Sequence, residues 1–194
     1  MMVVVASRSS NLSSSREALA MLLPDDDVVL WPDPRAKEAD VVIGWDVPAD
    51  LYEGMCRLRL VHGLAAGVDN LIRPSLAGHV PVCRIVDAAQ ARGMAEYVHR
   101  GTTYFHRGFD AMARARAEHQ WIHLKQSDAS SACVGVMGLG HMGLAVSRAL
   151  LNAGYRVRGW SRSPKRPRAS SASWDRRSWR PFCLAATYWC AFCH

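Results

Sequence analysis

The sequence predicts an α/β protein built on parallel sheets, in which one α/β unit is followed by the beginning of a second. Two observations predict this. Short apolar segments alternate with helical patterns over residues 1–90, and a strand–turn–helix–strand pattern with three spaced glycines occupies residues 132–165. Strands that are continuously apolar are typical of parallel sheets covered on both faces. A hydrophobic content of 49% is ample for two cores.

Residues 1–90 form the first predicted domain. Apolar runs of strand length, bounded by turn residues, predict five strands, at Val3–Ala6, Val28–Trp31, Asp40–Trp45, Leu58–Leu64 and Pro81–Ile85. Helices are expected between them at Glu17–Leu23 and Asp50–Cys56. Because strands and helices alternate, the strands are expected to pair in parallel.

Residues 91–125 form a linking helix region. Apolar residues recur at helical spacing through Ala91–Ala117, which predicts one long helix that serves as a spine between two domains. The polar segment Gln126–Ser131 then leads into the second domain.

The second domain begins with a dinucleotide fingerprint. A predicted strand, Cys133–Met137, runs into a G-x-G-x-x-G turn, and a helical pattern and a second strand, Tyr155–Trp160, follow. This context makes the glycine motif credible as the start of a Rossmann NAD(P)-binding domain, assigned here to residues 126–166. The cofactor-binding residues predicted in the turn are Gly138, Leu139, Gly140, His141, Met142 and Gly143.

Each glycine of the turn has a predicted function. Gly138 permits the tight turn, Gly140 lets the backbone approach a pyrophosphate, and Gly143 lets the helix pack closely on the strand. The N-terminus of the helix offers free N–H groups and a partial positive charge to phosphates. The alternative interpretation is a glycine-rich turn that binds no ligand.

The end of the second strand favours NADP(H) over NAD(H). NAD sites carry Asp or Glu about 20 residues after the first glycine to bind the ribose 2′-hydroxyl. Here Ser161, Arg162 and Ser163 occupy that place, with Lys165 beyond them and no acid. Serine hydroxyls and a guanidinium suit a 2′-phosphate. The alternative is that these charges belong to a solvated loop.

The positive charge of the chain is concentrated in its last part. The net charge is +7; residues 156–194 contain nine Lys and Arg against one Asp, whereas residues 1–155 are close to neutral. A nucleic-acid-binding protein needs a folded basic face with positioned aromatics, and residues 1–155 offer none. No nucleic-acid partner is therefore expected.

The chain is expected to be cytoplasmic. No apolar run reaches membrane-spanning length, and the N-terminus lacks the basic flank of a secretory signal. Three cysteines, Cys56, Cys83 and Cys133, lie in apolar segments and are predicted to be reduced thiols in a core.

Residues 167–194 are expected to be an aberrant tail. The tail is rich in Ser, Arg and Trp, lacks periodicity, and breaks the strand–helix alternation. A shifted frame joins the third base of each codon to the first two bases of the next. Whatever codons are used, it encodes Leu across Tyr188-Trp189, Val across Trp189-Cys190 and Leu across Phe192-Cys193, which is an apolar strand pattern. Our hypothesis is a frameshift after about Arg166, and sequencing of the coding DNA decides it.

Residues 1–166 resemble the D-isomer-specific 2-hydroxyacid dehydrogenases, and within them the glyoxylate/hydroxypyruvate reductase A group. The matching segments are Val61–Asn70, Met94–Tyr97, the segment ending at Trp121, and Gly159–Ser163. The glycine motif is also similar to that of the 3-hydroxyisobutyrate dehydrogenases. Those proteins start with the motif, whereas here an α/β unit precedes it, which favours the first family.

The resemblance implies a flavodoxin-like catalytic domain, of which residues 1–90 are a part, and a homodimer. It also implies that backbone N–H groups of Ala66, Gly67 and Val68 hold the carboxylate of a small 2-oxo acid, glyoxylate or hydroxypyruvate. An ordinary tight turn after a strand explains this loop equally well.

The resemblance implies hydride transfer from a nicotinamide to the 2-oxo acid, with a His–Glu pair supplying the proton and an Arg binding the substrate. No residue of this chain matches these three, so no catalytic residue is assigned and the chain is expected to be truncated and inactive. The alternative is a non-catalytic nucleotide-binding or dimerisation module.

Overall fold

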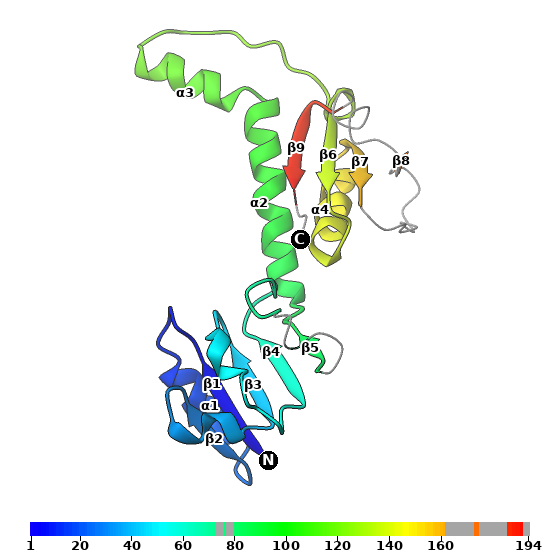
Figure 1. Ribbon diagram of the computed structural model, residues 1–194. Coiled ribbons are helices and arrows are strands. Elements are labelled where there is room, and N and C mark those ends of the chain that lie inside the picture. The colour runs from blue at the N-terminus through cyan, green and yellow to red at the C-terminus, as the bar shows by residue number, and fades with distance from the viewer. Residues whose placement is uncertain (73–75, 77–79, 162–172, 175–185, 192–194) are drawn as a thin grey trace. The chain divides into compact units, whose positions relative to one another are not determined.

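A computed structural model of the chain describes residues 1–72, 76, 80–161, 173–174 and 186–191. The chain divides into two compact units, Met1–Val86 and Asp87–His194, each with its own parallel sheet (Figure 1). The predicted α/β class is confirmed.

The sheet of unit 1 has the strand order β2-β1-β3-β4-β5, and every pair is parallel. This is the flavodoxin-like order, in which the carboxyl ends of the strands form one edge that can bind ligands. The strands are β1 (Met2–Ala6), β2 (Asp27–Leu30), β3 (Val41–Gly44), β4 (Leu60–Gly63) and β5 (Val82–Cys83).

The central strand β1 is buried on both faces, which explains its continuous valine run. Val4 belongs to an apolar cluster with Val42 and Val61, whereas Val3 and Val5 pack in a second cluster near α1 (Ser13–Leu22). A parallel sheet covered on both sides requires apolar residues at every position of such a strand.

The predicted helix at Asp50–Cys56 is wrong. The structure has one 3₁₀ turn there, Ala49–Leu51, preceded by Pro48. Gly54 follows with a φ of 83°, a left-handed conformation that ends helical geometry. A second 3₁₀ helix, Pro34–Glu38, was not predicted, and it begins at a side-chain cap from Asp33.

Unit 1 should lose stability in acid through Asp40, whose carboxylate is 7% exposed. It accepts a hydrogen bond from the Met2 N–H at 2.8 Å and one from Arg57 at 3.2 Å. The Met2 bond, followed by the charge of Arg57, lowers the pKa of Asp40 below its usual value. A lowered pKa stabilises the fold above the unfolded-state value of about 4, and the effect disappears as pH falls through the folded-state value.

Asp40→Asn should therefore destabilise unit 1 at pH 7 and lose that effect below about pH 4. Urea unfolding followed through the NMR signals of β1 and β3 measures this. An equal deficit at pH 7 and pH 3 would contradict the charge-based explanation.

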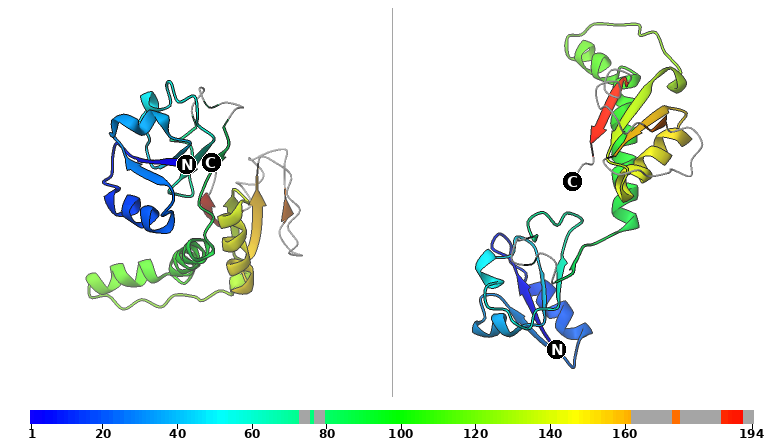
Figure 2. Two further views of the ribbon diagram at one scale, coloured as in Figure 1. Left: turned by 90° about the horizontal axis from the view of Figure 1, so that it is seen from below. Right: turned by 45° about the vertical axis from the view of Figure 1, so that its right-hand side comes forward.

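Unit 2 contains a four-stranded parallel sheet of order β8-β7-β6-β9, the order expected of the start of a Rossmann domain. Helix α2 packs against α4, as Figure 2 shows. The elements are α2 (Ala88–His106), α3 (Phe109–Ala117), β6 (Cys133–Met137), α4 (His141–Asn152), β7 (Arg156–Trp160), β8 (Ser173–Trp174) and β9 (Tyr188–Ala191).

The single long helix predicted at Ala91–Ala117 is two helices. The break lies at Gly108, which has a φ of 68°. L side chains rarely adopt this φ, and a Cβ here would also come within 2.6 Å of the Leu124 side chain. α2 begins at Asp87, whose carboxylate accepts from two N–H groups of the first turn.

The tail differs from its expected character where it is described. Tyr188–Ala191 forms β9 in parallel register with β6, and Ser173–Trp174 pairs with β7. Aromatic residues favour strands, and the Trp189 ring lies over Gly135, where a Cβ would be 2.5 Å from the ring. The shifted frame places its forced Leu and Val in the same strand. Of residues 167–194, the structure describes 173–174 and 186–191.

Only one of the three predicted core cysteines is buried. Cys133 lies in the core, whereas Cys56 and Cys83 are exposed. Cys56 follows the 3₁₀ turn and Cys83 lies in the edge strand β5, so neither has a sheet neighbour on both sides. Within the described ranges, no helix is long and apolar enough to cross a membrane.

Candidate functional site

The turn between β6 and α4 has the geometry predicted from its glycines. Gly138 has a φ of 95°, which L-residues rarely adopt, and its N–H donates to the Trp160 carbonyl at 2.8 Å. α4 begins at His141 with Gly140 as its N-cap, and no side chain caps it. The first N–H groups of this helix therefore have no acceptor within the helix and are available to an anion.

Gly143 is required by close packing. A Cβ there would lie 1.8 Å from the Gly138 carbonyl oxygen, which is backbone and cannot move aside. By contrast, no atom lies within 4 Å of a Cβ placed on Gly140. The turn is thus closed beneath Gly143 and open beside Gly140, where a pyrophosphate would approach the backbone.

The other residues of the turn divide between core and surface. Leu139 is 2% exposed, and its methyl groups would collide with a Cβ on Gly159. Its side chain is therefore a core element, and only its backbone can face a cofactor. His141 is exposed and Met142 is half-buried.

Sequence reasoning missed Ser147 in the helix that follows. Its buried hydroxyl donates to the Gly143 carbonyl at 2.7 Å, which ties the first turn of α4 to the second. A serine four residues after a helix-start glycine was the available signal.

The end of β7 lies beside the turn. Met137 and Trp160 are partners in the β6–β7 register, so Ser161 emerges at the same carboxyl edge as Gly138. Ser161 is 8% exposed. Arg162 and Ser163, the other residues predicted for the 2′-phosphate, lie outside the described residues.

The loop predicted to bind a carboxylate follows β4 in unit 1. Ala66, Gly67 and Val68 are half-buried. The Val68 carbonyl accepts a hydrogen bond from the N–H of Leu71 at 2.8 Å, which closes a turn, and the Leu71 side chain is fully buried. The loop lies at the carboxyl edge of a flavodoxin-like sheet, the edge at which such folds bind ligands. The glycine turn lies wholly in unit 2.

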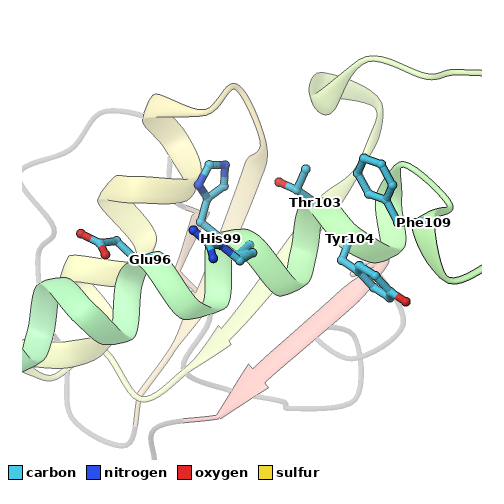
Figure 3. Close-up of a pocket in the computed structure, with 6 residues that line it drawn as sticks. Glu96, His99, Thr103, Tyr104 and Phe109 are labelled. Carbon is cyan, nitrogen blue, oxygen red and sulfur yellow. The ribbon is translucent and has the colours of Figure 1, made fainter. Parts of the chain in front are cut away.

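A separate hollow of about 510 Å³ lies on α2 and the start of α3 (Figure 3). Glu96 and His99 belong to it, but they point in different directions from α2 and do not converge on one point. The hollow therefore does not offer a shared acid–base position. Its lining residues are Glu96, His99, Arg100, Thr103, Tyr104 and Phe109.

The chain is similar to a defined family of dehydrogenases. The family model described as "D-isomer specific 2-hydroxyacid dehydrogenase, NAD binding domain" matches residues 102–182. The match continues past residue 166, where the resemblance was expected to end. Among curated proteins, glyoxylate/hydroxypyruvate reductase A of Serratia proteamaculans is 30% identical over 153 residues, or 76% of this chain and 49% of the relative. The Citrobacter koseri protein of the same name is 30% identical over 154 residues, with the same two shares.

Solved structures agree with this similarity. A D-isomer specific 2-hydroxyacid dehydrogenase of Xanthobacter autotrophicus, solved with NADPH and MES, has a TM-score of 0.85 and 28% identity, covering 99% of this chain and 63% of that one. The NADPH-dependent glyoxylate/hydroxypyruvate reductase of Sinorhizobium meliloti, solved with NADP and sulfate, has a TM-score of 0.80 and 28% identity, covering 99% and 62%. The chain spans about half the length of the curated relatives it matches. Over the matched residues the chain is similar to the D-isomer-specific 2-hydroxyacid dehydrogenases.

Proposed function

We propose that this chain carries the nucleotide-binding turn and the substrate-carboxylate loop of an NADPH-dependent reductase of glyoxylate or hydroxypyruvate. The observation that carries the proposal is the β6–α4 turn, with its closed packing beneath Gly143 and its open backbone at Gly140. The relatives named as glyoxylate/hydroxypyruvate reductases support the substrate class.

NADPH is the proposed cofactor. The residues fit it, because Ser161-Arg162-Ser163 follow β7 in the sequence, with no carboxylate to repel a 2′-phosphate. Two relatives were solved with NADPH or NADP, which supports the same choice. The bound nicotinamide would supply the hydride. The Gly140 turn and the N-terminus of α4 would hold the pyrophosphate, and Ser161 and Arg162 would hold the ribose phosphate.

In unit 1, the backbone N–H groups of Ala66–Val68 would hold the substrate carboxylate. The His–Glu pair and the Arg that the family resemblance implies are not matched among the 194 residues. The chain as given is therefore proposed to bind nucleotide without turning over a 2-oxo acid. A stable nucleotide-binding module without a substrate site is the second candidate, favoured if a monodisperse chain binds NADPH but its Ala66–Val68 loop does not respond to a carboxylate.

The cofactor preference can be measured by the fluorescence of bound NADPH and NADH. Wild type should bind NADPH at least about tenfold more tightly, because a charge-assisted bond to the 2′-phosphate contributes about 1.5–3 kcal/mol. Ser161→Asp should reverse the preference by placing a carboxylate where NAD sites carry one.

Ser130→Asp is the matched control, since it adds the same charge to an exposed residue before β6, at the opposite edge of the sheet. An unchanged preference in Ser161→Asp would count against this placement of the ribose. The absence of any binding by a folded wild-type chain would count against the whole proposal.

A homodimer is also proposed. Soluble monomers seldom expose many large apolar side chains along one segment of the chain. Helices α2 and α3 and the segment after them expose six: Tyr97, Tyr104, Phe105, Phe109, Met112 and Trp121. Tyr104 stacks on Phe109, with ring centroids 6.2 Å apart, so part of this surface is already ordered.

Analytical ultracentrifugation should find a dimer of the wild-type chain at micromolar concentration. Phe109→Asp should shift the chain to monomer, because it places a charge in the apolar surface. Met21→Asp, at a residue 77% exposed on α1 of unit 1, is the control and should leave the dimer intact. A wild-type chain that stays monomeric at about 100 times that concentration would refute the dimer.

A further inference from the structure

Arg84 lies over the proposed carboxylate loop, although no motif singles it out. We infer that Arg84 is a positioning residue, whose guanidinium holds the Ala66 carbonyl and thereby aims the Gly67 N–H at the substrate carboxylate. This inference rests on the proposed function of the Ala66–Val68 loop. It assigns to Arg84 an effect on substrate affinity that does not require contact with the substrate.

The contact follows from the topology of unit 1. β5 pairs in parallel with β4, so the residues after each strand emerge at the same edge of the sheet. Arg84 follows β5, and its Nη1 donates to the Ala66 carbonyl oxygen at 3.3 Å. The next residue, Ile85, donates its N–H to the Ala65 carbonyl at 3.1 Å. Two successive residues therefore anchor two successive carbonyls of the loop.

A fixed Ala66 carbonyl also fixes the Gly67 N–H. Both groups belong to one planar trans peptide, in which the C=O and the N–H point in opposite directions. The guanidinium holds the oxygen end of this peptide, so the N–H end is directed away from Arg84. A bond at one end of a peptide also polarises the other end, which strengthens the N–H as a donor.

The Gly67 backbone needs such an anchor. No atom lies within 4 Å of a Cβ placed on Gly67, so no side chain packs against that side of the residue. Glycine itself has the widest choice of backbone angles. Without the bond from Arg84, the peptide would sample several orientations, and part of the binding free energy would be spent on ordering it.

The test uses the full chain labelled with ¹⁵N, and oxalate as a non-reacting carboxylate. The readouts are the Gly67 amide resonance without ligand, and the oxalate dissociation constant from the shift of that resonance. The variants are Arg84→Gln and the conservative Arg84→Lys. The matched control is Arg16→Gln, because Arg16 Nε also donates to a backbone carbonyl of unit 1, that of Val28, at 3.0 Å.

Arg84→Gln should move the ligand-free Gly67 resonance and raise the oxalate dissociation constant about tenfold, the effect of one charge-assisted hydrogen bond. Arg84→Lys should stay within about threefold of wild type, because an ammonium keeps a charged donor for the carbonyl, whereas the Gln amide is neutral and shorter than the Arg side chain. Arg16→Gln should change neither readout.

Three results would overturn the inference. If Arg84→Gln leaves both the Gly67 resonance and the oxalate dissociation constant unchanged, the role of Arg84 is refuted but the carboxylate loop is not. The same holds if Arg84→Gln weakens oxalate binding without moving the ligand-free Gly67 resonance, since that pattern indicates direct contact between Arg84 and oxalate. A Gly67 resonance that ignores oxalate in wild type refutes the carboxylate loop of the proposed function, and the role of Arg84 with it.

Discussion

Gly143→Ala should abolish NADPH binding. The new Cβ would lie 1.8 Å from the Gly138 carbonyl oxygen and 3.0 Å from its carbonyl carbon, so the clash is with the backbone of the turn. Relief requires α4 to move away from β6. Overpacking of this kind costs about 3 kcal/mol or more, which corresponds to a loss of affinity above about 100-fold if it falls on the bound state.

The displacement would also remove the proposed anion site. Gly140 and the first turn of α4 would no longer present their N–H groups where β6 ends. The bond from Ser147 to the carbonyl of residue 143 lies within α4, so it would move with the helix. The binding assay is the fluorescence titration with NADPH, and circular dichroism reports whether unit 2 stays folded.

Two other glycines serve as controls. Gly93→Ala replaces an exposed glycine inside α2 where nothing lies within 4 Å of the new Cβ, so it should leave binding intact and stabilise the helix by about 0.5–1 kcal/mol. The Cβ added by Gly140→Ala also has no protein atom within 4 Å, so this variant should keep unit 2 folded and weaken NADPH binding. Normal NADPH binding by Gly143→Ala would mean that the turn is not closed as described.

The parts of the fold that sequence predicts well are those in which one local pattern has one physical cause. The apolar run Val3–Ala6 corresponds to β1 because a strand covered on both faces must be apolar at each position. The glycine spacing at 138–143 likewise reflects three local constraints, and the structure places a left-handed turn and a close contact at two of them.

The sequence-based predictions fail where the local structure depends on a contact with a residue distant in the sequence. A helical pattern continues through Gly108, but this glycine adopts a left-handed conformation that separates α2 from α3, and the Leu124 side chain of the following segment lies against it. The strand β9 has no alternating or β-branched pattern, and its place depends on pairing with β6 about 50 residues earlier. Arg84 was missed for the same reason, because only the β4–β5 pairing brings it to Ala66.

Gly44→Ala should unfold unit 1 and leave NADPH binding intact. Gly44 ends β3 opposite Ala6, and a Cβ there would come within 2.1 Å of the Ala6 carbonyl oxygen and 2.7 Å of a Val47 methyl group. The Trp45 N–H already donates to that carbonyl, so β1 and β3 cannot separate without breaking the ladder. Overpacking costs about 1–3 kcal/mol and more where the clash is with backbone, which approaches the whole stability of a small unit at the low end of the usual range of about 5–15 kcal/mol.

The two glycine variants together test whether the proposed substrate site and the proposed nucleotide site depend on separate units of the fold. Units 1 and 2 have separate sheets and separate apolar clusters, so damage to one core need not reach the other. Gly44→Ala should abolish the response of Gly67 to oxalate and keep the NADPH affinity, whereas Gly143→Ala should do the reverse. NMR of the same labelled chain reads both sites. Loss of NADPH binding in Gly44→Ala would show that unit 2 folds only on a folded unit 1, because no atom of the glycine turn belongs to the damaged sheet.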